Sequence, residues 1–145
     1  MQYAELNSLS NFSFLKGASH PEELVESAAK NNYQAIALTD ECSFAGIVRA
    51  HQEAKKHNFK LIVGTEITLT EGAQVVLLAE NLSAYKDISR LITLGRSRQG
   101  KGSYQLSLDD LAGLQYGLII WKQTKRKINK KLLAWSRNAF VSDYG

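Results

Sequence analysis

The chain has 145 residues, of which 44% are hydrophobic and 22% charged, the balance of a soluble globular protein large enough to bury one core. Its apolar runs are too short to span a membrane, its N-terminus lacks the pattern of a secretion signal, and a single cysteine excludes an internal disulfide, so we expect a cytoplasmic protein with no membrane partner. The formal net charge of +4 arises from the end of the chain, because residues 1–121 hold 11 Lys/Arg against 13 Asp/Glu and residues 122–145 hold 7 against 1.

The first elements in chain order are strands and helices that alternate. Alternating and continuous apolar runs predict strands over 3–9, 33–39, 60–67, 74–79 and 116–121. We expect the third strand to be broken at Gly64, and the dipeptide Glu71-Gly72 after it is typical of a hairpin turn.

Helical periodicity fills the segments between these strands. The first helix is predicted over 20–30, where Ser19 and Glu22 have the spacing of a capping box and Pro21 suits the first turn. Further helices are predicted over 44–57, from a cap at Ser83 onward, briefly at 107–110, and as a basic amphipathic helix over about 124–140. The glycine-rich, cationic stretch 95–103 is predicted to be a mobile loop.

Strands that alternate with helices at this spacing favour an α/β fold built from βαβ units with right-handed crossovers. Chemistry in such folds is usually placed at the carboxyl ends of the strands. Asp40 and Glu41 follow the second predicted strand directly, and Glu66 lies at the end of the third. We therefore expect these three carboxylates to meet at one edge of the sheet, where carboxylates can bind a divalent metal.

Each of these residues also has a purely structural interpretation. Asp40 is expected to cap the following helix rather than to bind metal, and Glu66 is equally compatible with a buried salt bridge or with hydrogen bonds to the backbone. Cys42 is expected to be a buried apolar residue rather than a reactive thiol. His51 and His57 lie six residues apart on one predicted helix and do not share a face.

Three stretches of the sequence resemble the PHP (polymerase and histidinol phosphatase) domain. They are residues 11–25, 37–51 and 62–66, and the likeness extends in order over about residues 3–140. It is closest to the N-terminal region of bacterial error-prone DNA polymerases. The resemblance implies a distorted (β/α) barrel with a metal cluster at the strand ends, of which this chain would form the N-terminal part.

Carried over position by position, the resemblance implies that the metal site is vestigial. The family's first His-x-His pair falls at Asn7 and Leu9, and the acid that often follows falls at Lys16. Only Glu66 keeps the usual ligand, with Asp40 and Glu41 as the remaining candidates, so we expect no catalytic residue and no cofactor in this chain. The later ligands of the family would lie beyond residue 145.

Three functions are compatible with the sequence. The first is a non-catalytic scaffold that contacts the remainder of an error-prone DNA polymerase and other damage-response polymerase components, in a protein of DNA replication and damage-induced repair synthesis. The second is a phosphoesterase that uses Glu66, Glu41 and Asp40 with Zn or Mn. The third is a module that binds DNA through Lys125, Arg126, Lys127 and Lys130.

The loop that carries Arg96, Arg98 and Lys101 allows the same DNA-binding interpretation. For this loop and for the basic stretch near the end of the chain, cations exposed to solvent are the simpler interpretation.

We treat residues 1–145 as one truncated part of a PHP domain, whether a cloned fragment or a shortened reading frame. We therefore expect an incomplete barrel with an exposed apolar edge.

Overall fold

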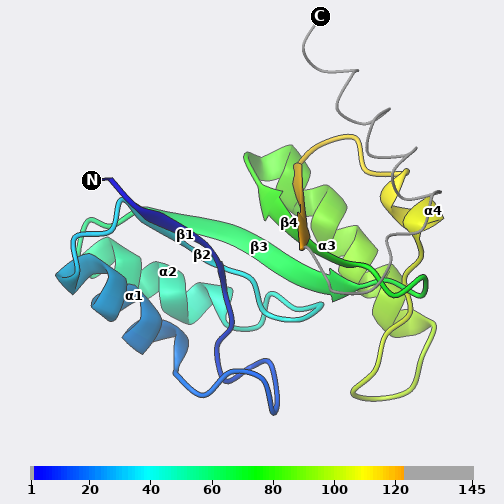
Figure 1. Ribbon diagram of the computed structural model, residues 1–145, viewed down its shortest axis with the longest axis horizontal. Helices are drawn as coiled ribbons and strands as arrows, with labels where there is room; N and C mark the ends of the chain where they lie inside the picture. Colours follow the sequence, from blue (N-terminus) through cyan, green and yellow to red (C-terminus); the bar gives the residue numbers. More distant parts are fainter. Residues whose placement is uncertain (1, 123–145) are drawn as a thin grey trace, which may run out of the picture.

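The computed structural model describes residues 2–122, so the basic helix predicted at about 124–140 lies outside the described residues. Within this range five strands form one sheet in the order β1-β2-β3-β4-β5 (Figure 1). The strands are β1 (Ala4–Ser8), β2 (Ala35–Leu38), β3 (Leu61–Thr68), β4 (Gln74–Ala79) and β5 (Leu118–Lys122). The helices are α1 (Pro21–Lys30), α2 (Ile47–Lys56), α3 (Leu82–Ser97) and the short α4 (Leu108–Leu111).

The sheet changes direction part-way along the chain. β1 pairs with β2 and β2 with β3 in parallel, whereas β3 and β4 form an antiparallel hairpin and β5 is antiparallel to β4. The hairpin turn lies where predicted, and Gly72 adopts the positive φ of 87° that glycine tolerates best. The α/β class with alternating strands and helices is therefore confirmed.

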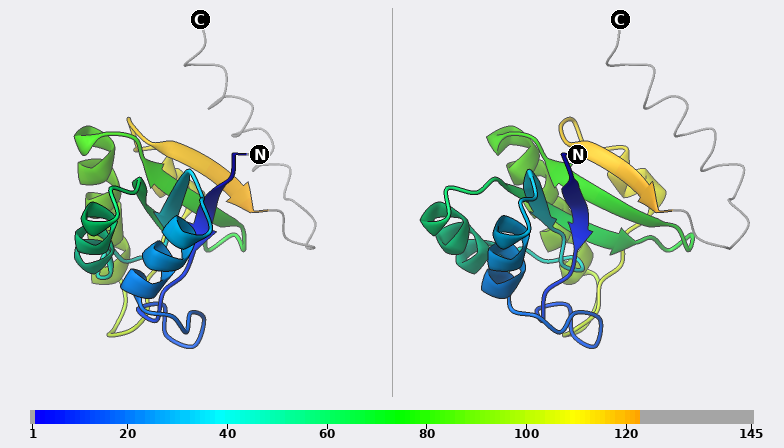
Figure 2. Two further views of the ribbon diagram at one scale, coloured as in Figure 1. Left: turned by 90° about the vertical axis from the view of Figure 1, so that its left-hand side faces the viewer. Right: turned by 60° about the vertical axis from the view of Figure 1, so that its left-hand side comes forward.

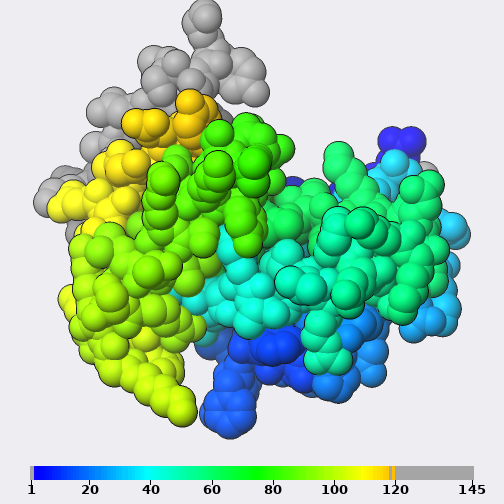
Figure 3. Space-filling view, turned by 180° about the vertical axis from the view of Figure 1, so that it is seen from behind, coloured from blue at the N-terminus to red at the C-terminus, as the bar shows by residue number. Residues whose placement is uncertain are grey.

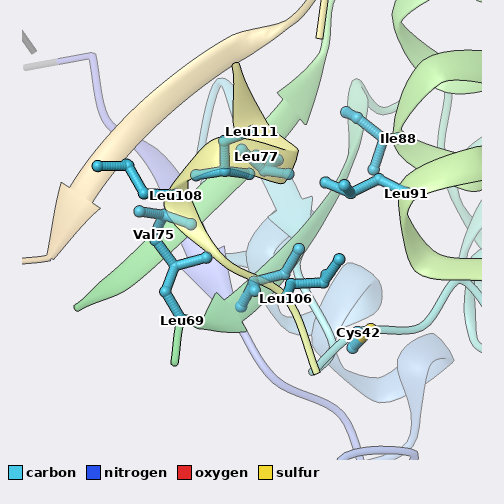
Figure 4. Packing of buried hydrophobic residues seen from close by; sticks show 10 residues of the cluster. Cys42, Leu69, Val75, Leu77, Ile88, Leu91, Leu106, Leu108 and Leu111 are labelled. Carbon is cyan, nitrogen blue, oxygen red and sulfur yellow. The ribbon is translucent and has the colours of Figure 1, made fainter. Parts of the chain in front are cut away.

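Helices α1, α2 and α3 lie on one side of the sheet (Figure 2). Two apolar clusters fill this interface because successive strand residues alternate between the faces. One joins α1 and α2 to Ile36 and Leu38 of β2. The other joins α3 and α4 to Val75 and Leu77 of β4 and includes Cys42 (Figure 4). A smaller cluster around Ala37, Val76 and Leu78 lies on the opposite face.

The predicted break at Gly64 is wrong, because β3 is continuous from Leu61 to Thr68. Gly64 serves close packing instead. A Cβ atom at this position would lie 2.7 Å from the carbonyl oxygen of Leu77 and 2.9 Å from the Thr39 side chain. Glycine therefore allows β3 to stay between β2 and β4 where any side chain would collide.

Several helix ends differ from the predictions. The box at α1 uses His20, whose backbone N–H donates to Glu23 Oε2 at 2.8 Å, so the pairing of Ser19 with Glu22 is wrong by one residue. Asn81 rather than Ser83 caps α3, accepting a hydrogen bond from the backbone N–H of Ala84. Pro21 occupies the first turn of α1 as predicted. At both shifted caps, those of α1 and α3, a polar side chain near the predicted one satisfies the free N–H groups.

Helix α2 begins at Ile47, three residues later than predicted. Helix α3 continues through Ser97 and takes up the start of the predicted loop 95–103. No helix within residues 2–122 is both long enough and apolar enough to cross a membrane.

Candidate functional site

The three predicted carboxylate residues meet at one edge of the sheet, which we call the strand-end rim. Asp40 and Glu41 follow β2 directly, and Glu66 lies near the end of β3. The backbones of Glu41 and Glu66 form a parallel bridge, and the Glu66 N–H donates to the carbonyl oxygens of Thr39 and Asp40 at 3.1 and 3.2 Å. The parallel pairing of β2 and β3 thus brings the residues together as expected.

The carboxylate of Asp40 is buried and holds the loop of residues 10–17. It accepts hydrogen bonds from the backbone N–H of Ser10, from the Ser10 hydroxyl and from the Ser13 hydroxyl, each at 2.7 Å. The prediction that Asp40 caps the following helix is wrong, because its acceptor capacity is directed to the loop. A buried charge needs such donors to offset the loss of its hydration.

The carboxylate of Glu41 is held by two other side chains. Its Oε2 atom forms an ion pair with Lys16 Nζ at 2.7 Å, and its Oε1 atom accepts a hydrogen bond from the Tyr104 hydroxyl at 2.9 Å. The backbone N–H of Glu41 donates to the Ser13 hydroxyl at 2.9 Å. Glu41 therefore links β2 to the loop of residues 10–17 and to the segment that precedes α4.

Arg96, at the end of α3, forms hydrogen bonds with the backbone at the same rim. It donates to the carbonyl oxygens of Glu41 and Cys42, both at 3.2 Å, and its guanidinium lies 5.3 Å from the centre of the Tyr104 ring. Cys42 has a positive φ of 44°, an unfavourable conformation for a residue with a side chain. The contacts of Arg96 hold the backbone in this conformation.

Two ionisable groups at the rim remain protonated at neutral pH. Burial raises the pKa of Tyr104 to about 12, with its hydrogen bond to Glu41 acting in the same direction. Burial also raises the pKa of the Cys42 thiol to about 11. Cys42 is therefore a buried, weakly nucleophilic residue, which confirms the structural interpretation of this position.

The side-chain oxygens at the rim are not arranged to bind a divalent metal cluster. Both oxygens of Asp40 are occupied by hydrogen-bond donors, and both oxygens of Glu41 are occupied by Lys16 and Tyr104. The amide oxygen of Asn7 accepts from the Thr39 hydroxyl at 2.6 Å. No group of three or more His, Cys, Asp or Glu suited to a metal occurs in residues 2–122. Glu66 is buried, and the ligand role predicted for its carboxylate stays a prediction.

Of the residues predicted to contact nucleic acid and described by the structure, two are engaged in contacts within the protein. Arg96 braces the rim, and Arg98 forms a two-pronged ion pair with Asp110 at 2.6 and 2.9 Å, so both act within the protein. Lys101 is exposed. The other candidates, Lys125, Arg126, Lys127 and Lys130, lie outside the described residues.

Sequence reasoning missed the residues that occupy the rim. Ser13 lies in the stretch 11–25 that carries the family resemblance, Ser10 lies directly before it, and a buried aspartate's need for donors points toward such hydroxyls. Tyr104 and Arg96 are 63 and 55 residues away from Glu41 in sequence. No spacing rule connects residues so far apart.

Most of the chain matches a known protein family. Residues 5–137 match the family model of the PHP domain. The chain belongs to the PHP family. It is 52% identical over 122 residues to the error-prone DNA polymerase of Saccharophagus degradans, which covers 83% of the chain and 12% of that polymerase. It is 50% identical over 139 residues to the error-prone DNA polymerase of Pseudomonas aeruginosa, covering 95% of the chain and 13% of that polymerase.

Solved structures support the fold of this PHP region. One is described as a putative metal-dependent phosphoesterase from Bifidobacterium adolescentis, with a TM-score of 0.56, 26% identity, and coverage of 66% of this chain and 34% of that one. Another is an amidohydrolase from Chromobacterium violaceum, with a TM-score of 0.63 and 17% identity over 94% of this chain and 72% of that one. The partial barrel expected from the resemblance is thus confirmed as a fold.

Proposed function

We propose that this PHP domain is a non-catalytic scaffold in an error-prone DNA polymerase and contacts the rest of that polymerase. The relatives named error-prone DNA polymerase are about eight times as long as the matched region, which supports the remainder of such a polymerase as the partner. In this proposal the whole protein is a cytoplasmic nucleotidyltransferase that acts in DNA replication and in translesion synthesis during repair of DNA damage. Other damage-response polymerase components are further partners.

One observation carries the scaffold role: a loop anchored by hydrogen bonds presents large apolar side chains to solvent. Phe14 is 84% exposed and Leu15 is 89% exposed, and Phe12 beside them is partly exposed. We call these three residues the apolar tip. The loop that carries them projects from the lower edge of the molecule in Figure 1, and its blue atoms form a knob at the lower edge of Figure 3.

The apolar tip is held in place rather than left loose. Asp40 binds Ser10 and Ser13, and a Cβ at Gly17 would lie 2.1 Å from the Ser10 carbonyl oxygen, so the two ends of the loop are in close contact. Leu15 has a positive φ of 62°, which costs on the order of 1 kcal/mol. A loop that keeps two apolar residues exposed at this cost is suited to insertion into a partner surface.

The test is to replace Phe14 and Leu15 by serine. Wild-type chain is mixed with the Pseudomonas aeruginosa error-prone polymerase from which the matching N-terminal region has been removed, and binding is measured by calorimetry. We expect the double variant to lose at least about tenfold in affinity, because apolar anchors dominate such interfaces. Its thermal midpoint should stay near that of wild type because both side chains are exposed.

The matched control is Leu82→Ser, which changes another exposed leucine, at the start of α3. This control should bind like wild type. Absence of binding by the wild-type chain would refute the scaffold role. Equal binding by the double variant would instead show that the contact lies elsewhere on the domain.

A phosphoesterase is the second candidate, supported by the description of the Bifidobacterium structure. It would use Glu66, Glu41 and Asp40 to hold Zn or Mn. The occupied oxygens of Asp40 and Glu41 weigh against it. Hydrolysis of p-nitrophenyl phosphate that depends on added Mn²⁺ and is lost in Glu66→Gln would establish this activity.

A further inference from the structure

A lysine side chain lies at the strand-end rim, at the position where the family resemblance places an acid. Lys16 extends from the loop of residues 10–17, and its Nζ atom lies 2.7 Å from Glu41 Oε2. The Lys16 side chain is 41% exposed and that of Glu41 is 23% exposed, so the pair lies at the mouth of the rim rather than inside the core. The loop is attached independently through Asp40, which fixes the direction of Lys16.

The positive charge of Lys16 has two roles at the rim. It neutralises Glu41, and it connects the loop to the end of β2. A second fixed cation, Arg96, lies behind the same residue on the carbonyl oxygens of Glu41 and Cys42. Lys16 at the Glu41 carboxylate and Arg96 at the backbone carbonyl of the same residue both repel a divalent cation, since the Coulomb energy of like charges at short distances is substantial even in a partly hydrated site.

We propose that Lys16 is a built-in counter-ion that replaces a divalent metal at the strand-end rim and excludes one. The rim is then stable without metal because an ammonium group held by the chain does the bridging. Its charge is also the reason that the remaining carboxylates do not recruit a metal. A single charge reversal at Lys16 should therefore make the rim respond to divalent cations.

The experiment measures thermal unfolding of the full chain in 1 mM EDTA and in 1 mM MnCl₂. The wild-type midpoint should be the same in both. Lys16→Met should lower the midpoint by about 3 °C in both, the effect expected for an ion pair of about 1 kcal/mol or less. Lys16→Glu should be less stable than wild type in EDTA and should recover several degrees in MnCl₂.

Two further variants separate the counter-ion from a general effect of removing a charge. Lys101→Met removes an exposed lysine from another loop and should behave like wild type. In a Glu41→Gln background, Lys16→Met should change the midpoint less than it does alone, because the two residues act as a pair.

The proposal is overturned if wild type loses stability in EDTA or retains stoichiometric metal after purification. It is also overturned if Lys16→Met unfolds at the wild-type temperature, or if Lys16→Glu folds and is indifferent to Mn²⁺. Should Lys16→Glu fail to fold, the EDTA response of wild type and the paired effect of Lys16→Met with Glu41→Gln decide the question. These readouts depend on stability and metal content and are independent of whether the apolar tip binds a polymerase.

Discussion

Asp40 shows how a single residue at the rim determines the conformation of a loop. Its buried carboxylate accepts three hydrogen bonds, and two of them come from the hydroxyls of Ser10 and Ser13. Ser13 also accepts a hydrogen bond from the backbone N–H of Glu41, so one hydroxyl satisfies a buried carboxylate and a partly buried N–H group. The loop is therefore ordered by the need to solvate one charge with protein donors.

Ser13→Ala should lower the free energy of unfolding by about 2 kcal/mol. The substitution leaves one Asp40 oxygen with fewer donors and leaves the Glu41 N–H without its acceptor, and unsatisfied buried groups cost more than a lost surface bond. Urea unfolding followed by circular dichroism measures the change. Ser103→Ala, which removes a hydroxyl from an exposed loop, should change stability by less than about 0.5 kcal/mol. Equal effects of the two substitutions would contradict the role given to Ser13.

At the scale of elements, β3 is the strand on which the others are assembled. It pairs in parallel with β2 on one side and antiparallel with β4 on the other. Gly64 lies opposite Leu78 in the β4 pairing, where the neighbouring backbone leaves no space for a side chain. The central position of β3 is thus possible only because of the glycine that the sequence pattern suggested as a break.

Gly64→Ala should lower the free energy of unfolding by about 2 kcal/mol, the usual cost of overpacking. The collision is with the Leu77 carbonyl oxygen, which cannot move without disturbing the β3–β4 hydrogen bonds. The control is Gly100→Ala, where a Cβ meets no atom within 4 Å. Chemical denaturation of the two variants measures the difference, and a Gly64→Ala protein as stable as the control would be inconsistent with the packing described.

For the whole molecule, acid stability depends in part on the ion pair that ties α4 to the end of α3. The hydrogen bonds from Arg98 lower the pKa of Asp110 from 3.8 to about 2. A carboxyl whose pKa is lower in the folded state stabilises the protein above its unfolded pKa. This stabilisation is present above about pH 4 and is lost as the pH falls from about 4 to 2.

Asp110→Asn should therefore lower the free energy of unfolding by about 1 kcal/mol at pH 7, a value reduced from the full pKa shift because Arg98 is partly exposed. The difference between variant and wild type should shrink as the pH falls from 4 to 2. Urea unfolding at pH 7, 4 and 3 measures this. A difference that stays constant over this range would exclude the ion pair as its source.

The order of the elements was predictable from sequence because hydrophobic periodicity reports which faces are buried. All five strands and the hairpin at Gly72 were expected at or near their positions. Helix ends were less predictable, as at Asn81, because several adjacent polar residues can cap a helix. The position of Asp40, Glu41 and Glu66 at one edge of the sheet followed from the parallel pairing of β2 and β3.

The contacts made by those carboxylates were not predictable. The partner of Glu41 at Tyr104 comes from a distant segment, and the direction of Lys16 depends on a loop conformation that no pattern encodes. The resemblance alone indicated that Lys16 replaces an acid. The ion pair of its ammonium group with the neighbouring carboxylate is visible in the structure alone.

The hairpin between β3 and β4 has a consequence for attaching other proteins or labels to this domain. Because β4 reverses direction and β5 reverses it again, β5 runs the same way as β1, β2 and β3. Lys122 lies opposite Gln74, which in turn lies opposite Thr68 at the end of β3. A fluorophore or fusion partner joined before β1 is thus placed at the opposite end of the strands from the rim, whereas one joined directly to Lys122 is placed at the same end as the rim, two strands away from β3.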